Sequence, residues 1–422
     1  MEYVITPKPL AGVVKAQPSK SAAQRLLICS SLANGQSVID RIGFSDDIKA
    51  AWRVAAQLGL SQTSIVGRTA IVNGGGDLVG DTAFCGESGA VLRLMLPLAF
   101  LSGKRVTFSG AQRHISRPMD AYAQIVTSQG GEWTQAEQSV TVRHKLRGGE
   151  FRIVNATAAS QFLSGLMLAL PLVQEDSVLH IIAPEESLPY VLLTQQTQRL
   201  FGVECDVDAK RGLISIPGGQ TYLPANADVE GDWSHAAYAV AAGAIGEEGV
   251  SLRGLDPQSL QADKNILLFL NQMGGHYSFD DKGVLHVDSA QLRPITVDIS
   301  ECPDLLAVLA VLACAARGTS RITNRLQYKE NSRFASLSAA LGALGGKVSH
   351  EGDGLVIQGT GRLRGGEADC FCDHRVAMAL AVASSICDNP VTLVGTECVR
   401  KSAPLFWDEF KNLGGQFDER AR

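Results

Sequence analysis

A glycine spacing of about 70 residues constrains the fold of this chain more than any other feature of its sequence. One local pattern recurs six times: a helical stretch ends at one or two glycines, and a strand, a turn and a second strand follow. A glycine in this position supplies the left-handed backbone conformation that ends many helices. The first glycines of the six copies are Gly59, Gly130, Gly202, Gly274, Gly345 and Gly414.

A second landmark recurs in step with the glycines. In each copy a helix rich in small residues ends, a polar turn follows, and a strand begins. These strand positions are Val38, Val106, Val178, Val250, Arg321 and Val391, and they are spaced by 68 to 72 residues. Two separate landmarks that share one period predict six structural repeats.

Each repeat is expected to contain two helices of different character. A helix such as 377–387 is apolar on nearly all sides and is therefore buried. A strand such as 391–394 follows, then an amphipathic helix that ends at the glycine. A hairpin closes the unit, as in 347–350 followed by 355–357. A unit of this size cannot bury its own apolar face, so we expect two globular groups of three units. The alternative is an open solenoid of six units.

Composition excludes several classes of protein. Hydrophobic residues make up 45% of the chain and charged residues 19%, which is typical of a globular protein with a large core. The net charge of −5 argues against a nucleic-acid partner. Apolar runs such as 162–173 and 305–316 are shorter than the roughly 20 residues of a membrane span. We also expect no signal peptide, because the N-terminus lacks a basic segment followed by an apolar one. The nine scattered cysteines indicate a reducing cytoplasm.

In nearly every repeat, a basic or polar side chain is predicted to mark the start of the buried helix. Lys20, Ser21 and Arg25 crowd one helix start, and Arg93 lies one turn into the helix after a glycine-rich loop. Arg117 precedes a proline and then a helix. Helix starts attract anions, so cations at several converging starts predict a deep site for multiply charged anions. Taken singly, each segment is equally consistent with an ordinary cap or a surface arginine. The cations concerned are Lys20, Arg93, Arg117, Arg333, Arg375 and Lys401.

The C-terminal half adds acidic groups to this pattern. Asp304 precedes the apolar run 305–316, and Asp373 and His374 precede another apolar helix. Asp373 and His374 are possible metal ligands, but no third ligand has suitable spacing, so we expect no metal.

Nine segments, spread over the whole chain in a fixed order, resemble those of the 5-enolpyruvylshikimate-3-phosphate synthase (EPSP synthase) family. They read PSKSAAQR, GESGAVLR, RPMDA, SQFL, SLPY, VEGDWSHAAY, CPDLLAVLA, KENSR and CDHRVAMALA, and a lysine, Lys401, follows them. The resemblance implies an α/β fold of two lobes, each with three βαβαββ units in an inside-out barrel. One lobe would comprise 1–18 with 230–422 and the other 19–229, with the active site in the cleft between them.

The resemblance also implies a reaction. The substrates would be shikimate 3-phosphate and phosphoenolpyruvate, and the products EPSP and phosphate. The family implies a cytoplasmic monomer with no cofactor, no metal, no nucleic acid and no membrane partner. The chemistry needs a base near the 5-hydroxyl of shikimate 3-phosphate and an acid near the enol methylene, because addition and elimination move two protons in opposite senses.

The roles implied by the family fall on named residues. Phosphoenolpyruvate would be held by Lys20, Arg117, Arg333, Arg375 and Lys401. Shikimate 3-phosphate would be held by Ser21, Arg25, Ser160, Gln161, Ser187, Tyr190, Asp304 and Lys329, with Gly89 in the substrate loop. Asp304 would be the base, and the acid is left open between Glu330, Lys20 and Lys401. Supporting positions behind these residues would be Glu87, Arg93, Asp373 and His374.

Three positions depart from the family pattern, and two rival functions remain. Many members have Asn in place of Glu87, Thr in place of Ala90 and Ser in place of Ala159, which bears on substrate affinity rather than on reaction class. The nearest rival is UDP-N-acetylglucosamine enolpyruvyl transferase, which has a cysteine where this chain has Gln112. A ligand-binding relative without catalytic activity is the other alternative.

Overall fold

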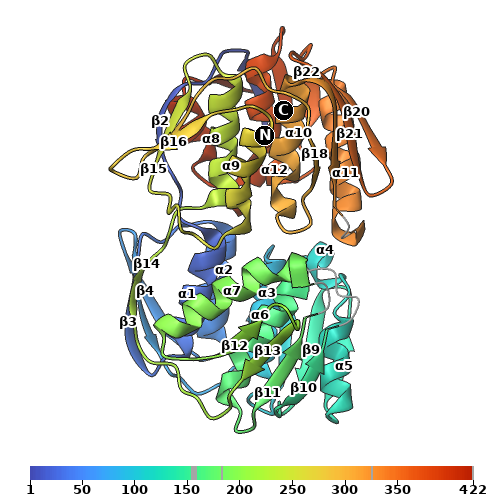
Figure 1. Cartoon of the computed structure of the whole chain (residues 1–422). Coiled ribbons are helices and arrows are strands. Elements are labelled where there is room, and N and C mark those ends of the chain that lie inside the picture. Colours follow the sequence, from blue (N-terminus) through green and yellow to red (C-terminus); the bar gives the residue numbers. More distant parts are fainter. Residues whose placement is uncertain (154–158, 182–183, 325–326, 421–422) are drawn as a thin grey trace. The chain divides into compact units, whose positions relative to one another are not determined.

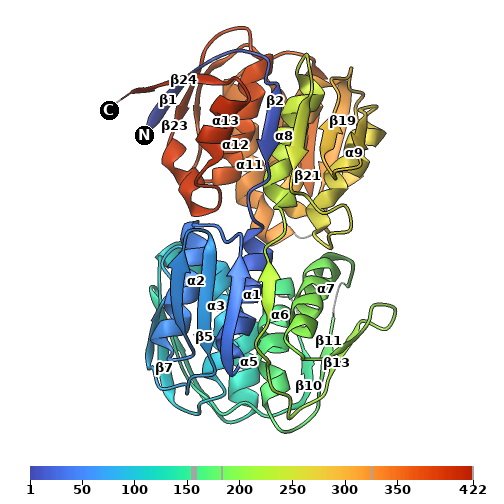
Figure 2. The same ribbon diagram turned by 90° about the vertical axis from the view of Figure 1, so that its left-hand side faces the viewer.

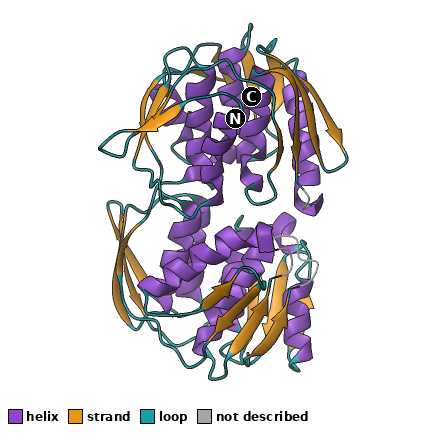
Figure 3. Ribbon diagram, in the orientation of Figure 1, coloured by secondary structure: helices purple, strands orange, loops and turns teal. Residues whose placement is uncertain are grey.

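The repeat predicted from the glycines is present as six four-stranded sheets (Figures 1 and 3). The computed structural model describes residues 1–153, 159–181, 184–324 and 327–420. The described chain divides into two compact units. The continuous unit is Pro18–Val229, and the split unit joins Met1–Gln17 to Glu230–Arg422.

The continuous unit contains three repeats followed by a short closing strand. Its first repeat is α1 (Lys20–Leu32), β3 (Gly35–Asp40), α2 (Asp46–Gln57), β4 (Gln62–Val66) and β5 (Thr69–Gly74). The second is β6 (Thr82–Phe84), α3 (Gly89–Ala99), β7 (Arg105–Ser109), α4 (Gln112–Ile115), α5 (Asp120–Ser128), β8 (Glu132–Gln135) and β9 (Ser139–Arg143). The third is β10 (Gly149–Arg152), α6 (Ala159–Ala169), η1 (Leu170–Leu172), β11 (Ser177–His180), α7 (Pro184–Leu200), β12 (Asp206–Asp208) and β13 (Leu213–Ile216), and β14 (Asn226–Asp228) closes the unit.

The split unit begins with two N-terminal strands and resumes after the continuous unit. Those strands are β1 (Glu2–Thr6) and β2 (Gly12–Lys15). Its first repeat goes on with α8 (Trp233–Ile245), β15 (Val250–Arg253), η2 (Ala262–Asn265), α9 (Ile266–Gln272), β16 (Tyr277–Phe279) and β17 (Leu285–Val287). The next is β18 (Thr296–Asp298), η3 (Pro303–Leu305), α10 (Leu306–Ala315), β19 (Arg317–Thr323), α11 (Gln327–Ala343), β20 (Lys347–Glu351) and β21 (Gly354–Thr360). The last is β22 (Gly366–Asp369), α12 (His374–Ala383), η4 (Ser384–Ile386), β23 (Val391–Val394), η5 (Thr396–Lys401), α13 (Phe406–Asn412) and β24 (Gln416–Arg420).

All six sheets share one strand order. In the second repeat the order is β6-β7-β9-β8, where β6 runs parallel to β7 and the other pairs are antiparallel. The parallel pair needs a crossover helix, and α3 supplies it. The predicted α/β architecture is therefore confirmed, and the hairpin expected from 347–350 and 355–357 is the pair β20–β21, in which His350 faces Leu355.

The chain termini complete sheets that other segments begin. Strand β1 lies between β23 and β24, with Tyr3 opposite Leu393 and Glu419 (Figure 2). Strand β2 pairs with β15, and β14 pairs with β3. Each unit is therefore closed by a strand that is distant in sequence from its neighbours in the sheet.

The apolar helices form the interior of each unit, and the sheets lie outside them (Figure 3). Helix α10 is the clearest case, because every residue from Leu306 to Cys314 is buried. The apolar runs 162–173 and 305–316 form buried helices, α6 with η1, and α10. No helix in the described ranges has the length and apolar character needed to cross a bilayer.

The six landmark glycines all have the predicted left-handed backbone, with φ between 74° and 90°. Gly130 isolates this effect, because a Cβ placed there would meet no atom within 4 Å. We expect Gly130→Ala to lower the free energy of unfolding by about 1 kcal/mol through backbone strain alone. Gly342 is the matched control: it lies in the last turn of α11, is exposed and also has open space around it. Gly342→Ala should raise the free energy of unfolding by up to about 1 kcal/mol, and urea titration of both variants checks the pair.

One expectation about the cations is wrong for three of the six. Lys20, Arg93 and Arg375 do lie in the first turns of buried helices, α1, α3 and α12. The other three belong to the outer helices: Arg117 precedes α5, Arg333 lies within α11, and Lys401 ends η5 before α13. The buried helices α8 and α10 instead begin beside acidic residues, Asp232 and Asp304. Asp232 caps α8 by accepting a hydrogen bond from the backbone N–H of His235. The physical reason for the difference is that tertiary packing, rather than local charge, decides which helix of a repeat becomes buried.

Candidate functional site

In the continuous unit, Arg25 contacts two other predicted site residues, Ser21 and Tyr190. Its Nη1 donates to the carbonyl of Ser21 at 2.9 Å, and its Nη2 lies 3.4 Å from the carbonyl of Tyr190. Its Nε donates to Oγ1 of Thr194 at 2.8 Å and its Nη2 to Oγ of Ser164 at 3.1 Å. Burial lowers the pKa of Arg25 to about 10. Arg25 is 3% exposed, so its guanidinium mainly positions α1 against α7.

A second cluster surrounds Arg93, which is 2% exposed. Its Nη1 donates to the carbonyl of Gly89 at 3.3 Å and to Oε1 of Gln161 at 3.2 Å. Burial, and then the neighbouring charge of Arg117, lower the pKa of Arg93 to about 10. Two arginines close enough to oppose each other's charge form a region where an anion would be stabilised. A Cβ on Gly89 would lie 3.4 Å from Nη1 of Arg93, so a glycine fits this close approach.

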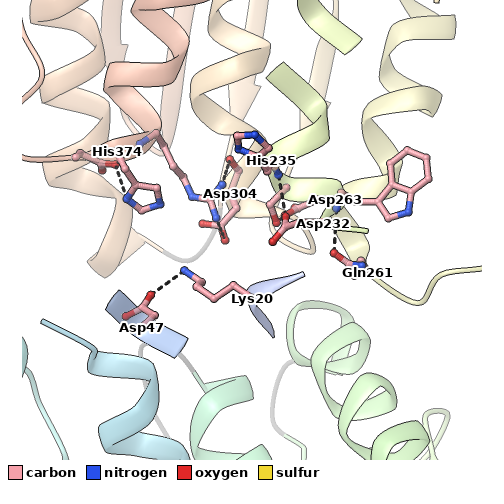
Figure 4. Close-up of polar contacts among 12 residues, drawn as sticks. Lys20, Asp47, Asp232, His235, Gln261, Asp263, Asp304 and His374 are labelled. Atoms are coloured by element: carbon pink, nitrogen blue, oxygen red, sulfur yellow. Dashed lines mark hydrogen bonds and ion pairs between the residues drawn. The ribbon is translucent and has the colours of Figure 1, made fainter. Parts of the chain in front are cut away.

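Lys20 and Glu87 each have a partner from the same unit. Nζ of Lys20, the first residue of α1, lies 3.1 Å from Oδ2 of Asp47 on α2 (Figure 4). Glu87 forms an ion pair with Arg113, and Nε2 of His114 lies 3.4 Å from the same carboxylate. Glu87 therefore belongs to a surface ion pair beside the glycine-rich loop.

In the split unit, Asp304 lies between two arginines. Its Oδ2 is 2.5 Å from Nη2 of Arg375 on α12, and its Oδ1 is 3.7 Å from Nη1 of Arg333 on α11. Burial by itself would lower the pKa of Arg375, but the Asp304 carboxylate outweighs it and raises this pKa. The Asp304 carboxylate stays 29% exposed. A partly exposed carboxylate held by cations at the start of a buried helix can accept a hydroxyl hydrogen bond.

Asp373 contacts both arginines of this network. Its Oδ2 accepts from Nε of Arg333 at 2.9 Å, and its Oδ1 accepts from the backbone N–H of Arg375 at 2.8 Å, which caps α12. Burial would raise the pKa of Asp373, but Arg333 and His374 outweigh it and hold this pKa below its usual range. Nδ1 of His374 lies 3.8 Å from Asp373 (Figure 4). Asp373 and His374 thus act as supports behind Arg333 and Arg375.

Other predicted site residues are placed only in part. Ser160 and Gln161 begin α6, and both are half-buried. Lys401 is half-buried at the end of η5, which packs against α12. The side chains of Ser187, Lys329 and Glu330 lie outside the described part of the chain.

Sequence reasoning missed four residues of these networks: Asp47, His235, Asp263 and Glu409. His235 begins α8, and its Nε2 lies 2.5 Å from Oε2 of Glu409 on α13 and 3.0 Å from Nε2 of Gln17. Two signals were available: His235 stands in the segment VEGDWSHAAY, and Asp263 lies three residues before the apolar run 266–270, whereas Asp304 directly precedes 305–316.

The His235–Glu409 pair has a pH signature. Burial would lower the pKa of His235, but Glu409 outweighs it and raises this pKa above 6.5. The pair therefore stabilises the fold fully below about pH 6.5, and the stabilisation is lost as pH rises through the folded pKa. We expect Glu409→Gln to lower the free energy of unfolding by roughly 1–3 kcal/mol at acidic pH and by less at alkaline pH. Denaturant titrations at several pH values check this, with the exposed Asp418→Asn as control; a difference that grows with pH would contradict it.

The fold places the chain in a structural class before any comparison of residues. Two units of three α/β repeats are the architecture of the enolpyruvyl transferases. Two structures of EPSP synthase from Acinetobacter baumannii match this fold with a TM-score of 0.84 at 22% sequence identity. The first of these matches covers 99% of this chain and 100% of the other.

Sequence comparison identifies the family. The profile of "EPSP synthase (3-phosphoshikimate 1-carboxyvinyltransferase)" matches residues 4–410. A 3-phosphoshikimate 1-carboxyvinyltransferase from Clostridium kluyveri is 38% identical, with 99% of each chain covered. Another from Clostridioides difficile is 37% identical, with 98% of each chain covered. The chain belongs to the EPSP synthase family.

Proposed function

We propose that this chain transfers the enolpyruvyl group of phosphoenolpyruvate to the 5-hydroxyl of shikimate 3-phosphate, giving EPSP and phosphate. Family membership over residues 4–410 supports the reaction class. The observation that carries the proposal for the site is the half-exposed Asp304 carboxylate between Arg375 and Arg333. Substrates of this charge need cations, and the reaction needs a carboxylate among them.

Asp304 is the base in this proposal. It accepts the proton of the 5-hydroxyl as that oxygen attacks the enol carbon, while an acid protonates the methylene. The product of this addition is a tetrahedral ketal phosphate, and its elimination returns a proton and expels phosphate. The acid is one of Glu330, Lys20 and Lys401.

The cations bind the substrates and stabilise the phosphate that leaves. Lys20, Arg117, Arg333, Arg375 and Lys401 hold phosphoenolpyruvate, and their charges stabilise the leaving phosphate. Ser21, Arg25, Ser160, Gln161, Ser187, Tyr190 and Lys329, with Asp304 and Gly89, hold shikimate 3-phosphate. The two sets of residues come from both lobes, 1–18 with 230–422 and 19–229.

Carboxylates already neutralise three of these cations. Asp47 pairs with Lys20, Asp304 with Arg375, and Asp373 with Arg333. An incoming phosphate or carboxylate must share these cations with the protein's own acids. This arrangement keeps the site stable without ligand and favours substrates that bring two or more negative charges.

The test is a phosphate-release assay with three substrate mixtures. Shikimate 3-phosphate with phosphoenolpyruvate should release phosphate and form EPSP. Release only when UDP-N-acetylglucosamine replaces shikimate 3-phosphate would select the rival transferase. Binding of both ligands with no release from any mixture would select the ligand-binding relative.

Two further properties belong to the proposal. The nine cysteines are free thiols, and seven of them are buried in clusters of apolar side chains, which supports a reducing cytoplasm as the compartment. We also propose that the enzyme acts as a monomer, with no cofactor and no nucleic-acid or membrane partner. Sedimentation across a range of concentrations tests the monomer.

A further inference from the structure

A buried carboxyl group lies behind the proposed base and has no role in the mechanism above. Asp263 lies in η2 and is 2% exposed. Its Oδ2 accepts a hydrogen bond from Oγ of Ser234, the second residue of α8. Among the described residues, none donates a hydrogen bond to Oδ1 of Asp263. A buried carboxylate with an unsatisfied oxygen is costly when ionised.

The surroundings of Asp263 come from several elements (Figure 4). Helix η2 packs against α8 and α9, and Asp263 lies in the same cluster of side chains as Asp232 and Asp304. The charged and titratable groups that act on Asp263 or are acted on by it are Asp304, Arg375, Asp232 and Cys302. Arg375 is therefore a cation that two carboxyl groups, Asp263 and Asp304, have in common.

This environment holds the pKa of Asp263 near neutral pH. Burial, and then the charge of Asp304, raise the pKa of Asp263 to about 7. Arg375 and the hydroxyl of Ser234 oppose the rise. Near neutral pH the side chain is thus present in both its protonated and its ionised form.

We propose that Asp263 is a positioning residue for enolpyruvyl transfer, and that its charge sets how strongly Arg375 holds the carboxylate of Asp304. This inference rests on the proposed function, in which Asp304 is the base. When Asp263 is protonated, its side chain carries no charge, and Arg375 attracts the Asp304 carboxylate, whose Oδ2 lies 2.5 Å from Nη2 of Arg375. The strongly held Asp304 carboxylate is then a weak base. With Asp263 ionised, Arg375 attracts two carboxylates, and the added negative charge favours proton uptake by Asp304.

A merely structural role for Asp263 makes a different prediction. A residue that only holds Ser234 and the start of α8 would affect stability and turnover alike at every pH. A residue that tunes a base changes the pH dependence of turnover. The pH profile of kcat/KM therefore separates the two roles.

The test uses Asp263→Asn with Ser234→Ala as the matched control. Asparagine keeps the shape of the side chain and carries no charge. We expect Asp263→Asn to remove an inflection near pH 7 from the kcat/KM profile and to lower kcat/KM above that pH by up to about tenfold, because the base loses a neighbouring negative charge. Ser234→Ala should keep the inflection and move it to higher pH, because the hydroxyl that stabilises the ionised carboxyl is gone. The substrate phosphates also titrate, with a pKa of about 6, but they contribute equally to each variant.

A second measurement does not depend on activity. The infrared carbonyl band of a protonated carboxyl should disappear with a midpoint near pH 7 in the ligand-free wild-type protein, and Asp263→Asn should lack this change. A profile with the wild-type inflection in Asp263→Asn, or a loss that is equal at every pH, overturns the inference. Absence of phosphate release from the wild-type protein overturns the proposed function instead, and the infrared titration still reports whether Asp263 holds the proton.

Discussion

Asp304→Asn is expected to reduce kcat by about 10²-fold or more, the usual range for loss of a general base. Asparagine keeps the shape of the side chain beside Arg375 but cannot accept the proton of the 5-hydroxyl. The loss should fall on kcat more than on KM, because the missing interaction belongs to the transition state. Steady-state phosphate release measures both constants.

Glu301→Gln is the matched control for this variant. Glu301 is an exposed carboxylate three residues earlier on the same segment, and its removal changes the local charge by the same amount. We expect Glu301→Gln to keep kcat within about twofold of the wild type. An equal loss of kcat in both variants would mean that the change in net charge, and not the loss of a base, causes it. An undiminished kcat in Asp304→Asn would remove Asp304 from the mechanism.

Arg375→Met should destabilise the split unit by about 3 kcal/mol or more, because it leaves the buried Asp263 and the partly exposed Asp304 without their cation. The Arg375 side chain is 7% exposed, and both Asp304 and Asp263 depend on its charge. The loss should be largest at neutral and higher pH, where these acids are ionised, and smaller at acidic pH, where they take up protons.

Urea unfolding at two pH values measures this effect. The control is Arg362→Met, which breaks an exposed ion pair of 2.6 Å with Asp388 and should cost only about 0–1 kcal/mol. A loss in Arg375→Met that is no larger than in Arg362→Met would mean that water compensates the buried acids. A loss that grows as pH falls would contradict the assignment of the destabilising charge to the carboxylates.

Periodic features of the chain were predictable from sequence. The six glycines have the expected left-handed backbone, and the apolar runs form buried helices, because both depend on local conformation and on hydrophobic pattern. The repeat count follows from the same features. The closing strands were harder to predict, since nothing near β1 in sequence indicates that it pairs with β23 and β24.

The candidate site was predictable where it lies within motifs, and less so where it depends on pairs distant in sequence. The ion pair of Asp304 with Arg375 joins residues that both stand in recognisable segments, but Asp263 and Asp47 stand in none. Three cations were placed at the wrong class of helix start, because tertiary packing decides which helix of a repeat becomes buried. Arg25 stands in a recognisable segment too, but its hydrogen bonds to Thr194 and Ser164 join it to residues distant in sequence, and nothing in the segment indicates them.

The position of β1 within the sheet β22-β23-β1-β24 has a consequence for synthesis on the ribosome. All strands of the continuous unit, Pro18–Val229, have been made once its last residue has left the ribosome. This unit can therefore fold while the rest of the chain is still being translated. The split unit cannot, because β1 is made before the continuous unit, whereas its sheet partners, β23 and β24, are made after it. Nascent β1 therefore stays unpaired while the continuous unit and most of the split unit are translated, which leaves it exposed to chaperones and to misassociation.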